Sequence, residues 1–220
     1  MRADKFKERL NAAAKDLGVA VAEQQNEAIL TYLAQLQRWN RTYNLTALRD
    51  PEQMLVQHVF DSLSLVPPVI EIAGDAALRI VDVGSGAGLP GIVLAIINPG
   101  WQVHCVDAVE KKMAFVRQVG SVLGLKNLHA VHGRIEQLPP YQADIVTSRA
   151  FSSLLDFVTL AGRHAAPGGV MLAMKGRRPD EEIQALAQQD EWIVESIDTL
   201  CVPQLDAQRC LVRLVRQGSL

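Results

Sequence analysis

The stretch that decides the fold is IVDVGSGAGLPG, residues 80–91. Its first four residues are mostly apolar and predict a buried strand, and the glycines after them predict a tight turn. Pro90 suits the first turn of a helix, because its missing N–H has no helical partner to lose there. The free N–H groups at such a helix start can face a polar ligand. The stretch therefore predicts a strand, a ligand-binding loop and a helix in succession.

From residue 79 onward, short apolar runs alternate with stretches of helical periodicity. The runs predict strands over residues 80–83, 103–106, 128–131, 145–146 and 170–174. The stretches between them predict helices over residues 89–97, 111–123 and 153–164. This alternation predicts an α/β fold with a mostly parallel, Rossmann-like sheet that has helices on both faces. Two further strands, 192–197 and 210–215, are separated by a short, mostly polar region and predict an antiparallel terminal hairpin.

The first part of the chain has the apolar spacing of helices. Residues 5–16 and 22–38 each place apolar side chains on one face. Asp50 and Pro51 predict the cap and first turn of a third helix, which Pro67-Pro68 is expected to end. The sequence thus predicts an N-terminal helical extension, residues 1–70, packed on a single compact domain, residues 71–220.

The composition is that of a folded, soluble domain. Of 220 residues, 49% are hydrophobic and 21% are charged, which argues against wholesale disorder. The net charge of -2 argues against a protein that grips naked nucleic acid by bulk charge, although it leaves room for a local basic face. We expect a cytoplasmic protein, because neither a signal peptide nor an apolar run long enough to span a bilayer is visible.

Neither disulfides nor metal binding has a recognisable pattern. Cys105, Cys201 and Cys210 are an odd number at irregular spacings, which does not make a disulfide framework. The five histidines do not combine with these cysteines at metal-ligand spacings. We therefore expect no metal site.

Two classes of cofactor use a glycine loop of this kind. Gly86, Gly88 and Gly91 satisfy the spacing of a dinucleotide-binding loop, so a nicotinamide or flavin enzyme is one candidate. Asp107 closes the second predicted strand, where a carboxylate can accept hydrogen bonds from ribose hydroxyls. That interaction serves either class of cofactor and does not choose between them.

The acid just before the first glycine favours S-adenosylmethionine. Asp82 makes the loop resemble the acid-x-Gly-x-Gly-x-Gly motif of methyltransferases that use this cofactor. A dinucleotide would place its diphosphate against the loop, where a buried carboxylate repels it. S-adenosylmethionine has no diphosphate, and the carboxylate would attract the ammonium group of its methionine part. The terminal hairpin also resembles the class I S-adenosylmethionine methyltransferase fold, which has a seven-stranded sheet.

Specific segments outside the loop carry a closer resemblance. They are NRTYNLT at 40–46, HVFDSL at 58–63, GRIE at 133–136, SRAF at 148–151 and MKG at 174–176, together with residues 82–91. Over nearly its whole length the chain resembles the bacterial family of small-subunit ribosomal RNA guanine-N7 methyltransferase G, also called glucose-inhibited division protein B. The resemblance implies methylation of a guanine of 16S ribosomal RNA, in the loop near the decoding site, to 7-methylguanosine.

The resemblance also implies a set of cofactor-binding residues. Gly84 and Leu89 would lie on the methionine and ribose side, Ile135 and Glu136 would flank the adenine, and Arg149 would lie beside the methyl group. With the loop argument above, the predicted cofactor site consists of Asp82, Gly84, Gly86, Leu89, Asp107, Ile135, Glu136 and Arg149.

The implied reaction needs no general base. The N7 atom of guanine is a neutral lone pair, so nothing has to be deprotonated before it attacks a sulfonium methyl group. Positioning and exclusion of water then do most of the catalysis. The predicted catalytic residues are Arg149 and, more weakly, Asp61, whose carboxylate would stabilise the positive charge of the product.

The RNA substrate should present the target base unpaired, because an A-form duplex buries the groove that exposes N7. The residues expected to contact RNA are Arg41, Asn44, His58, Lys175, Arg177 and Arg178. The partner is either 16S ribosomal RNA or a small-subunit assembly particle, with no membrane partner, and we expect a monomer. Two other functions stay open: a nicotinamide-dependent oxidoreductase that uses the same loop, and a cofactor-binding scaffold without catalysis.

Overall fold

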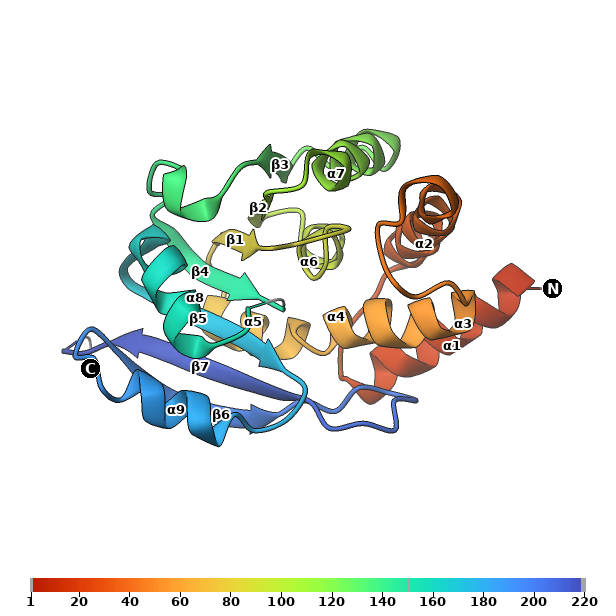
Figure 1. Ribbon diagram of the computed structural model, residues 1–220. Helices are drawn as coiled ribbons and strands as arrows, with labels where there is room; N and C mark the ends of the chain where they lie inside the picture. Colours follow the sequence, from red (N-terminus) through yellow and green to blue (C-terminus); the bar gives the residue numbers. More distant parts are fainter. Residues whose placement is uncertain (1, 150, 219–220) are drawn as a thin grey trace.

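One mixed sheet of seven strands forms the centre of the protein (Figure 1). The computed structural model describes residues 2–149 and 151–218, so Ala150 of the SRAF segment lies outside the described residues. The strand order is β3-β2-β1-β4-β5-β7-β6. The strands are β1 (Arg79–Val83), β2 (Gln102–Asp107), β3 (Leu128–His132), β4 (Ala143–Ser148), β5 (Ala165–Lys175), β6 (Trp192–Thr199) and β7 (Cys210–Arg216).

The pairing of these strands confirms the predicted α/β fold. Strands β1 to β5 run parallel, whereas β7 is antiparallel to both β5 and β6. Successive strands are added in opposite directions on the two sides of β1 and β4, and open α/β sheets bind ligands beyond the strand ends at such a point. The carboxyl ends of β1, β4 and β5 therefore define where a site is expected.

Helices pack on both faces of the sheet (Figure 1). One hydrophobic cluster joins the sheet to α1 (Arg2–Asp16), α2 (Glu23–Tyr43), α5 (Val66–Ala73), α6 (Gly91–Ile97) and α7 (Glu110–Val122). The other cluster joins it to α8 (Leu154–Ala161) and α9 (Asp180–Leu186). Neighbouring strand residues belong to opposite clusters, as Ile80 and Val81 do, because side chains alternate across a sheet.

The third helical stretch begins as the sequence predicts and ends earlier. It comprises α3 (Pro51–Met54), a π-helix (Leu55–Phe60) and α4 (Asp61–Leu63), and the Asp50 side chain caps it by accepting from the Glu52 N–H. The prediction that Pro67-Pro68 ends this helix is wrong, since both prolines lie in the first turn of α5. A proline is tolerated in a first turn because its missing N–H would have no partner there.

Further differences from the sequence prediction include α9 and the start of β5. Helix α9 has no counterpart in the sequence prediction, because it buries little apolar surface and Leu186 is its buried residue. Strand β5 begins at Ala165 instead of residue 170. The helices of the extension share one hydrophobic cluster with the sheet, and the division near residue 70, which α5 spans, stays a prediction. Within residues 2–149 and 151–218, no helix is long and apolar enough to cross a membrane.

Candidate functional site

The glycine loop connects the carboxyl end of β1 to α6, at the edge of the sheet where the parallel strands end. Gly84, Gly86 and Gly88 have φ angles of 67°, 58° and 87°, in the left-handed region that glycine adopts readily. The N–H of Gly84 donates to the Val106 carbonyl at 2.8 Å, which attaches the loop to the end of β2. No heavy atom of the described residues lies within 4 Å of a Cβ built on Gly86, so the loop faces open space there.

The last glycine of the motif is required by packing. A Cβ on Gly91 would lie 2.4 Å from Cys105 Sγ and 3.0 Å from Asp82 Oδ2. Gly91 therefore lets the start of α6 approach the sheet closely, while Gly86 leaves space for a ligand. Within one motif, Gly91 is thus required for packing and Gly86 for ligand space.

Asp82 is fully buried beneath the loop. Its Oδ2 accepts a hydrogen bond from the Gly91 N–H at 2.8 Å, and its Oδ1 has no partner among the described residues. Burial raises the pKa of Asp82 from 3.8 to about 7, against the lowering effect of the Gly91 hydrogen bond and of the charge on Arg149. An unpartnered buried carboxylate oxygen fits a cofactor that brings an ammonium group.

This pKa predicts a pH dependence of stability. Between the usual value of 3.8 and about 7, the folded protein holds a proton on Asp82 that the unfolded chain lacks. The stability contributed by that proton is therefore lost as the pH rises through about 7. We expect the free energy of unfolding of the parent, relative to Asp82→Asn, to fall as the pH is raised over this range. Saturating S-adenosylhomocysteine should reduce the fall, because its ammonium group would offset the buried charge.

Denaturant titrations of both proteins over a pH series, with and without S-adenosylhomocysteine, would measure this difference. A parent and an Asp82→Asn variant with parallel pH profiles would contradict the assignment of the titration to Asp82. If S-adenosylhomocysteine leaves the pH-dependent difference in unfolding free energy between the two proteins unchanged, the proposed contact between Asp82 and the cofactor is contradicted.

Asp107 holds two loops together at the end of β2. Its Oδ2 accepts from the Gly86 N–H at 2.9 Å, and its Oδ1 accepts from the Val109 N–H at 2.9 Å. Lys112 Nζ lies 3.6 Å from Oδ2. Both oxygens keep further acceptor capacity, since a carboxylate has about four lone-pair sites. Asp107 thus shapes the glycine loop besides being placed where a ribose would lie.

We expect Asp107→Ala to weaken cofactor binding by about 1–3 kcal/mol, because it leaves the Gly86 and Val109 N–H groups and the ribose hydroxyls without their acceptor. Calorimetry would compare S-adenosylhomocysteine with an analogue that lacks the ribose hydroxyls. Asp144→Ala is the control, because Asp144 also accepts from a backbone N–H, that of Arg79 at 2.7 Å, but at the opposite end of the sheet. If the Asp107 variant still prefers the cofactor over the analogue as the parent does, the ribose assignment is wrong.

Helix α2 of the extension supports the cofactor loop from behind. The hydroxyl of Tyr32, which is fully buried, donates to the Ala87 carbonyl at 3.0 Å. Gln25 Nε2 donates to the Ile96 and Ile97 carbonyls, the last ones of α6. The extension therefore holds both ends of the segment that carries the glycine loop and α6. Sequence reasoning missed this role, because Tyr32 looks like any apolar face residue of a helix.

The remaining predicted cofactor residues surround the same strand ends. Leu89 is buried in the turn that precedes α6. Ile135 and Glu136 lie in a single 3-10 turn, Ile135–Gln137, after β3. The Gly133 N–H donates to the Asp107 carbonyl at 3.1 Å, so this turn follows a segment that is tied to the end of β2. Ile135 is buried, whereas Glu136 is half-exposed. The Glu136 carboxylate lies 3.9 Å from the Arg134 guanidinium.

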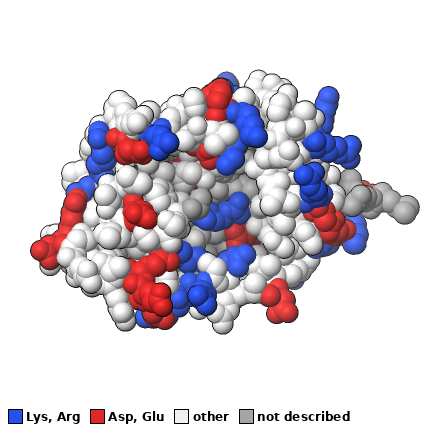
Figure 2. Space-filling view, viewed as in Figure 1, with Lys and Arg blue, Asp and Glu red and all other residues white. Residues whose placement is uncertain are grey.

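A cavity lies beyond the carboxyl ends of β4 and β5. This cavity of about 410 Å³ is lined by Thr46, Ala47, Leu48, Gln57, His58, Asp61, Arg149, Met174, Lys175, Gly176 and Arg209. Figure 2 shows a hollow in the middle of the corresponding face, with basic side chains inside it and along its lower rim. The cavity brings together residues of four of the segments that carry the family resemblance.

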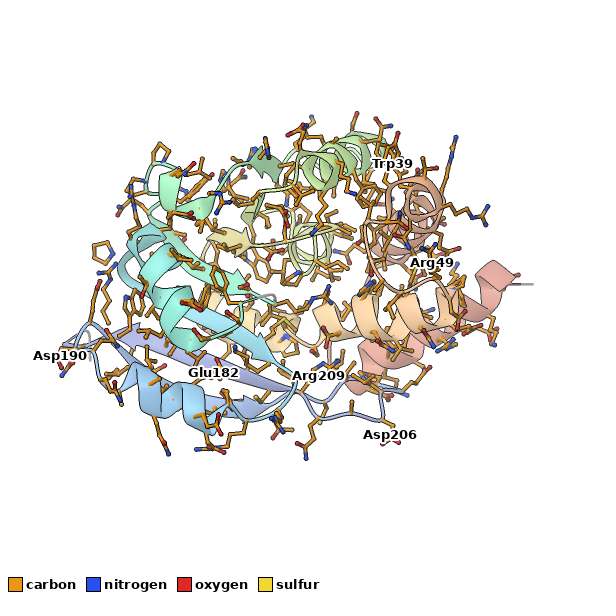
Figure 3. All side chains as sticks on the ribbon, in the orientation of Figure 1. Trp39, Arg49, Glu182, Asp190, Asp206 and Arg209 are labelled. Atoms are coloured by element: carbon orange, nitrogen blue, oxygen red, sulfur yellow. The ribbon has the colours of Figure 1, made fainter. Side chains whose placement is uncertain are left out.

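Asp61 is the centre of the charged groups in this cavity. Its Oδ2 accepts from Arg149 Nη1 at 3.1 Å, and its Oδ1 accepts from Arg209 Nε at 2.9 Å. The Asp61 side chain is 4% exposed, whereas each arginine side chain is 24% exposed. Arg209, labelled in Figure 3, lies just before β7 and was not predicted from the sequence. A lone arginine before a terminal strand gives no local signal of such a role.

His58 is held as a neutral ring at the edge of the cavity. Its Nε2 lies 2.8 Å from Thr46 Oγ1 and its Nδ1 lies 3.2 Å from the Gln57 carbonyl. Burial, with the nearby charge of Arg149, lowers the pKa of His58 to about 4. A neutral ring that donates from Nδ1 accepts from the threonine hydroxyl at Nε2, so both contacts are satisfied.

Apart from His58, the predicted RNA-binding residues fall into two groups. Lys175 is 11% exposed and pairs with Glu182 at 2.7 Å, and Arg178 pairs with Asp180 at 2.7 Å. Arg177 is exposed between them. Arg41 and Asn44 are exposed at the end of α2, and Asn44 caps that helix in the left-handed conformation. Among residues 2–149 and 151–218, no group of three or more His, Cys, Asp or Glu side chains is arranged to hold a metal ion.

Comparisons with known proteins identify the family. The family described as rRNA small subunit methyltransferase G matches residues 25–212. A relative from Bordetella petrii, named Ribosomal RNA small subunit methyltransferase G, is 60% identical over 96% of this chain and 84% of its own length. One of the same name from Bordetella avium is 57% identical over 97% and 95%. The solved structure of a SAM-dependent methyltransferase from Aquifex aeolicus superimposes with a TM-score of 0.58 at 19% identity, covering 78% of this chain and 96% of that one.

These matches span most of the chain, including the acid and glycine loop, the Asp61 segment and the Arg149 segment. The likeness to the Aquifex structure supports the fold alone, and the sequence matches do not favour a nicotinamide-dependent oxidoreductase. The chain belongs to the rRNA small subunit methyltransferase G family.

Proposed function

We propose that this chain transfers a methyl group from S-adenosylmethionine to N7 of a guanine in 16S ribosomal RNA. The observation that carries the proposal is the family match over residues 25–212, which includes the buried acid and the open glycine loop at the ligand end of the sheet. The protein would act in the cytoplasm on the RNA or on an assembling small subunit.

The residues present fit S-adenosylmethionine, which when bound supplies an electrophilic methyl group. Gly84 and Gly86 give the backbone a shape that leaves space beside the loop. Asp82 offers an unpartnered carboxylate oxygen, and Asp107 offers acceptor capacity at the end of β2. We assign Leu89, Ile135 and Glu136 to the same site, around the ribose and adenine.

The proposed chemistry is mostly positioning. The guanine N7 needs no base, and His58, with a pKa lowered to about 4, would be a weak one. Arg149 directly follows β4, two residues after Thr147, which is the register partner of Asp82 on β1. It also lines the cavity, so we place its side chain between the glycine loop and the cavity. Its guanidinium would help hold the target nucleotide against the cofactor site.

The test is tritiated methyl transfer to 16S ribosomal RNA from cells that lack this gene, followed by digestion to nucleosides. We expect 7-methylguanosine as the labelled product. A label on an exocyclic amine or on ribose would contradict the assignment to N7. Calorimetry with S-adenosylhomocysteine and with NAD separates the methyltransferase from an oxidoreductase, and cofactor binding without any transfer would indicate a scaffold.

A further inference from the structure

Asp61 makes contacts that differ from those of an acid facing a substrate. Each of its two oxygens accepts from a different guanidinium, Oδ2 from Arg149 and Oδ1 from Arg209. Only 4% of its side chain is exposed. The carboxylate is therefore enclosed with the two arginines, whose side chains are the more exposed members of this group.

The π-helix brings a second acceptor to Arg149. The Asp61 N–H donates to the Val56 carbonyl, five residues back, as a π-helical turn requires. The Gln57 carbonyl accepts from Arg149 Nη1 at 3.3 Å. Two acceptors from one turn, the Gln57 carbonyl and the Asp61 carboxylate, thus fix the position of a guanidinium that belongs to β4.

The contacts leave donors available to the cavity. Arg149 uses Nη1, and Arg209 uses Nε for Asp61 and Nη1 for the Gln208 carbonyl at 2.8 Å. A guanidinium has more N–H groups than these contacts occupy, and both arginines line the cavity. With one carboxylate between two guanidiniums, the group keeps a net positive charge.

The charge of this group favours an anion as its ligand. Methyl transfer to N7 moves a positive charge from the sulfonium onto the purine, and a net positive group against the purine would oppose that movement. Against a phosphate the same group is favourable, since arginine donors match phosphate oxygens in charge and in geometry. Lys175, the other cation of the cavity lining, already pairs with Glu182.

We propose that Asp61 is a positioning residue that ties Arg149 and Arg209 into one binding site for the RNA phosphodiester next to the target guanine. The proposal rests on the proposed function for its substrate. It gives Asp61 a role different from direct stabilisation of the product, because the carboxylate acts through the arginines that enclose it.

The decisive variant is Asp61→Asn, because it adds net positive charge to the site and replaces one of the two accepting oxygens with an NH2 donor, so that both arginines can no longer be held. If charge alone matters, RNA binding becomes tighter. If position matters, we expect the Kd for 16S ribosomal RNA, isolated from cells that lack this gene, to rise roughly tenfold. The affinity for S-adenosylhomocysteine should stay within about twofold, since the variant leaves the glycine loop unchanged.

Arg209→Gln provides an independent arm, because its side chain is 24% exposed and Asp61 keeps Arg149 as a partner in the variant. We expect a similar loss of RNA affinity and a salt dependence whose log–log slope is smaller by about 0.7, as for one lost contact to a single strand. The control is Arg216→Gln at the far end of β7, the strand that Arg209 precedes, because the Arg216 guanidinium pairs with Glu191 at 2.6 Å and lies outside the cavity lining. The double variant Asp61→Asn/Arg209→Gln should lose little more RNA affinity than either single variant, because the two residues act as one unit.

Filter binding over a salt series, with single-turnover transfer to the same RNA, distinguishes the outcomes. Tighter RNA binding by Asp61→Asn, or additive losses in the double variant, would overturn the positioning role. A slower transfer rate with unchanged RNA affinity would instead assign Asp61 to the developing charge on the purine. Failure of the parent to methylate the RNA would contradict the proposed function, while the binding comparison would still test the role of Asp61.

Discussion

Gly86→Val is expected to abolish binding of S-adenosylmethionine while the protein stays folded. The φ of Gly86 is 58°, and no heavy atom of the described residues lies within 4 Å of its Cβ position. A valine side chain would occupy the space that the ligand needs and would strain the loop that Asp107 holds through the Gly86 N–H. We expect affinity to fall by at least about 100-fold, equivalent to nearly 3 kcal/mol. Calorimetry with S-adenosylhomocysteine and a circular dichroism melt would measure the two quantities.

The control for backbone strain is Gly18→Val. Gly18 follows α1 with a φ of 67° and also has open space around its Cβ position. Both substitutions place a side chain in the left-handed region, at a cost of about 1–3 kcal/mol. We expect similar losses of stability from the two variants and a loss of cofactor affinity from Gly86→Val alone. A folded Gly86→Val protein with the affinity of the parent would place the cofactor elsewhere.

Arg149→Ala should cause the second large effect, in the transfer reaction. It removes the guanidinium between the glycine loop and the cavity and leaves the buried Asp61 carboxylate with Arg209 as its one remaining arginine. Loss of a charged hydrogen-bonding group, with its partner left buried, corresponds to about 3 kcal/mol or roughly 100-fold in the rate constant. Single-turnover transfer to 16S ribosomal RNA measures that rate, and we expect a larger loss than from Asp61→Asn.

Arg163→Ala is the matched control for this variant. The Arg163 guanidinium also donates to a backbone carbonyl, that of Leu138 at 3.3 Å, but it lies outside the cavity lining. We expect Arg163→Ala to transfer methyl groups at close to the parent rate. An Arg149→Ala protein as active as this control would remove Arg149 from the proposed site.

Much of the fold could be predicted from the sequence because its signals are local. The glycine loop lies between a strand and a helix that its own neighbours specify, and the alternation of apolar runs predicts the parallel sheet without knowledge of distant contacts. The same holds for the terminal hairpin, whose two strands pair as predicted. Local signals fail where one pattern has two uses, as in Pro67-Pro68, which can end a helix or begin one.

The chemical segments of the candidate site were visible in the sequence, but their relations to one another were not. Asp61 and Arg149 are 88 residues apart, and Asp61 and Arg209 are 148 apart. Tyr32 supports Ala87 across 55 residues. A side chain that acts through a distant partner has no spacing to reveal it, so Arg209 and Tyr32 escaped sequence analysis.

By itself, then, the sequence determined the fold class, the cofactor loop with its preceding acid, and the family, since each rests on residues that are neighbours along the chain. The tertiary structure alone decided that Gly91 serves packing while Gly86 faces open space. It also decided that Asp61 lies enclosed between two arginines. The physical reason is that burial and charge pairing depend on which strand ends and helices meet in space, and the switch in strand order at β1 and β4 brings those segments together.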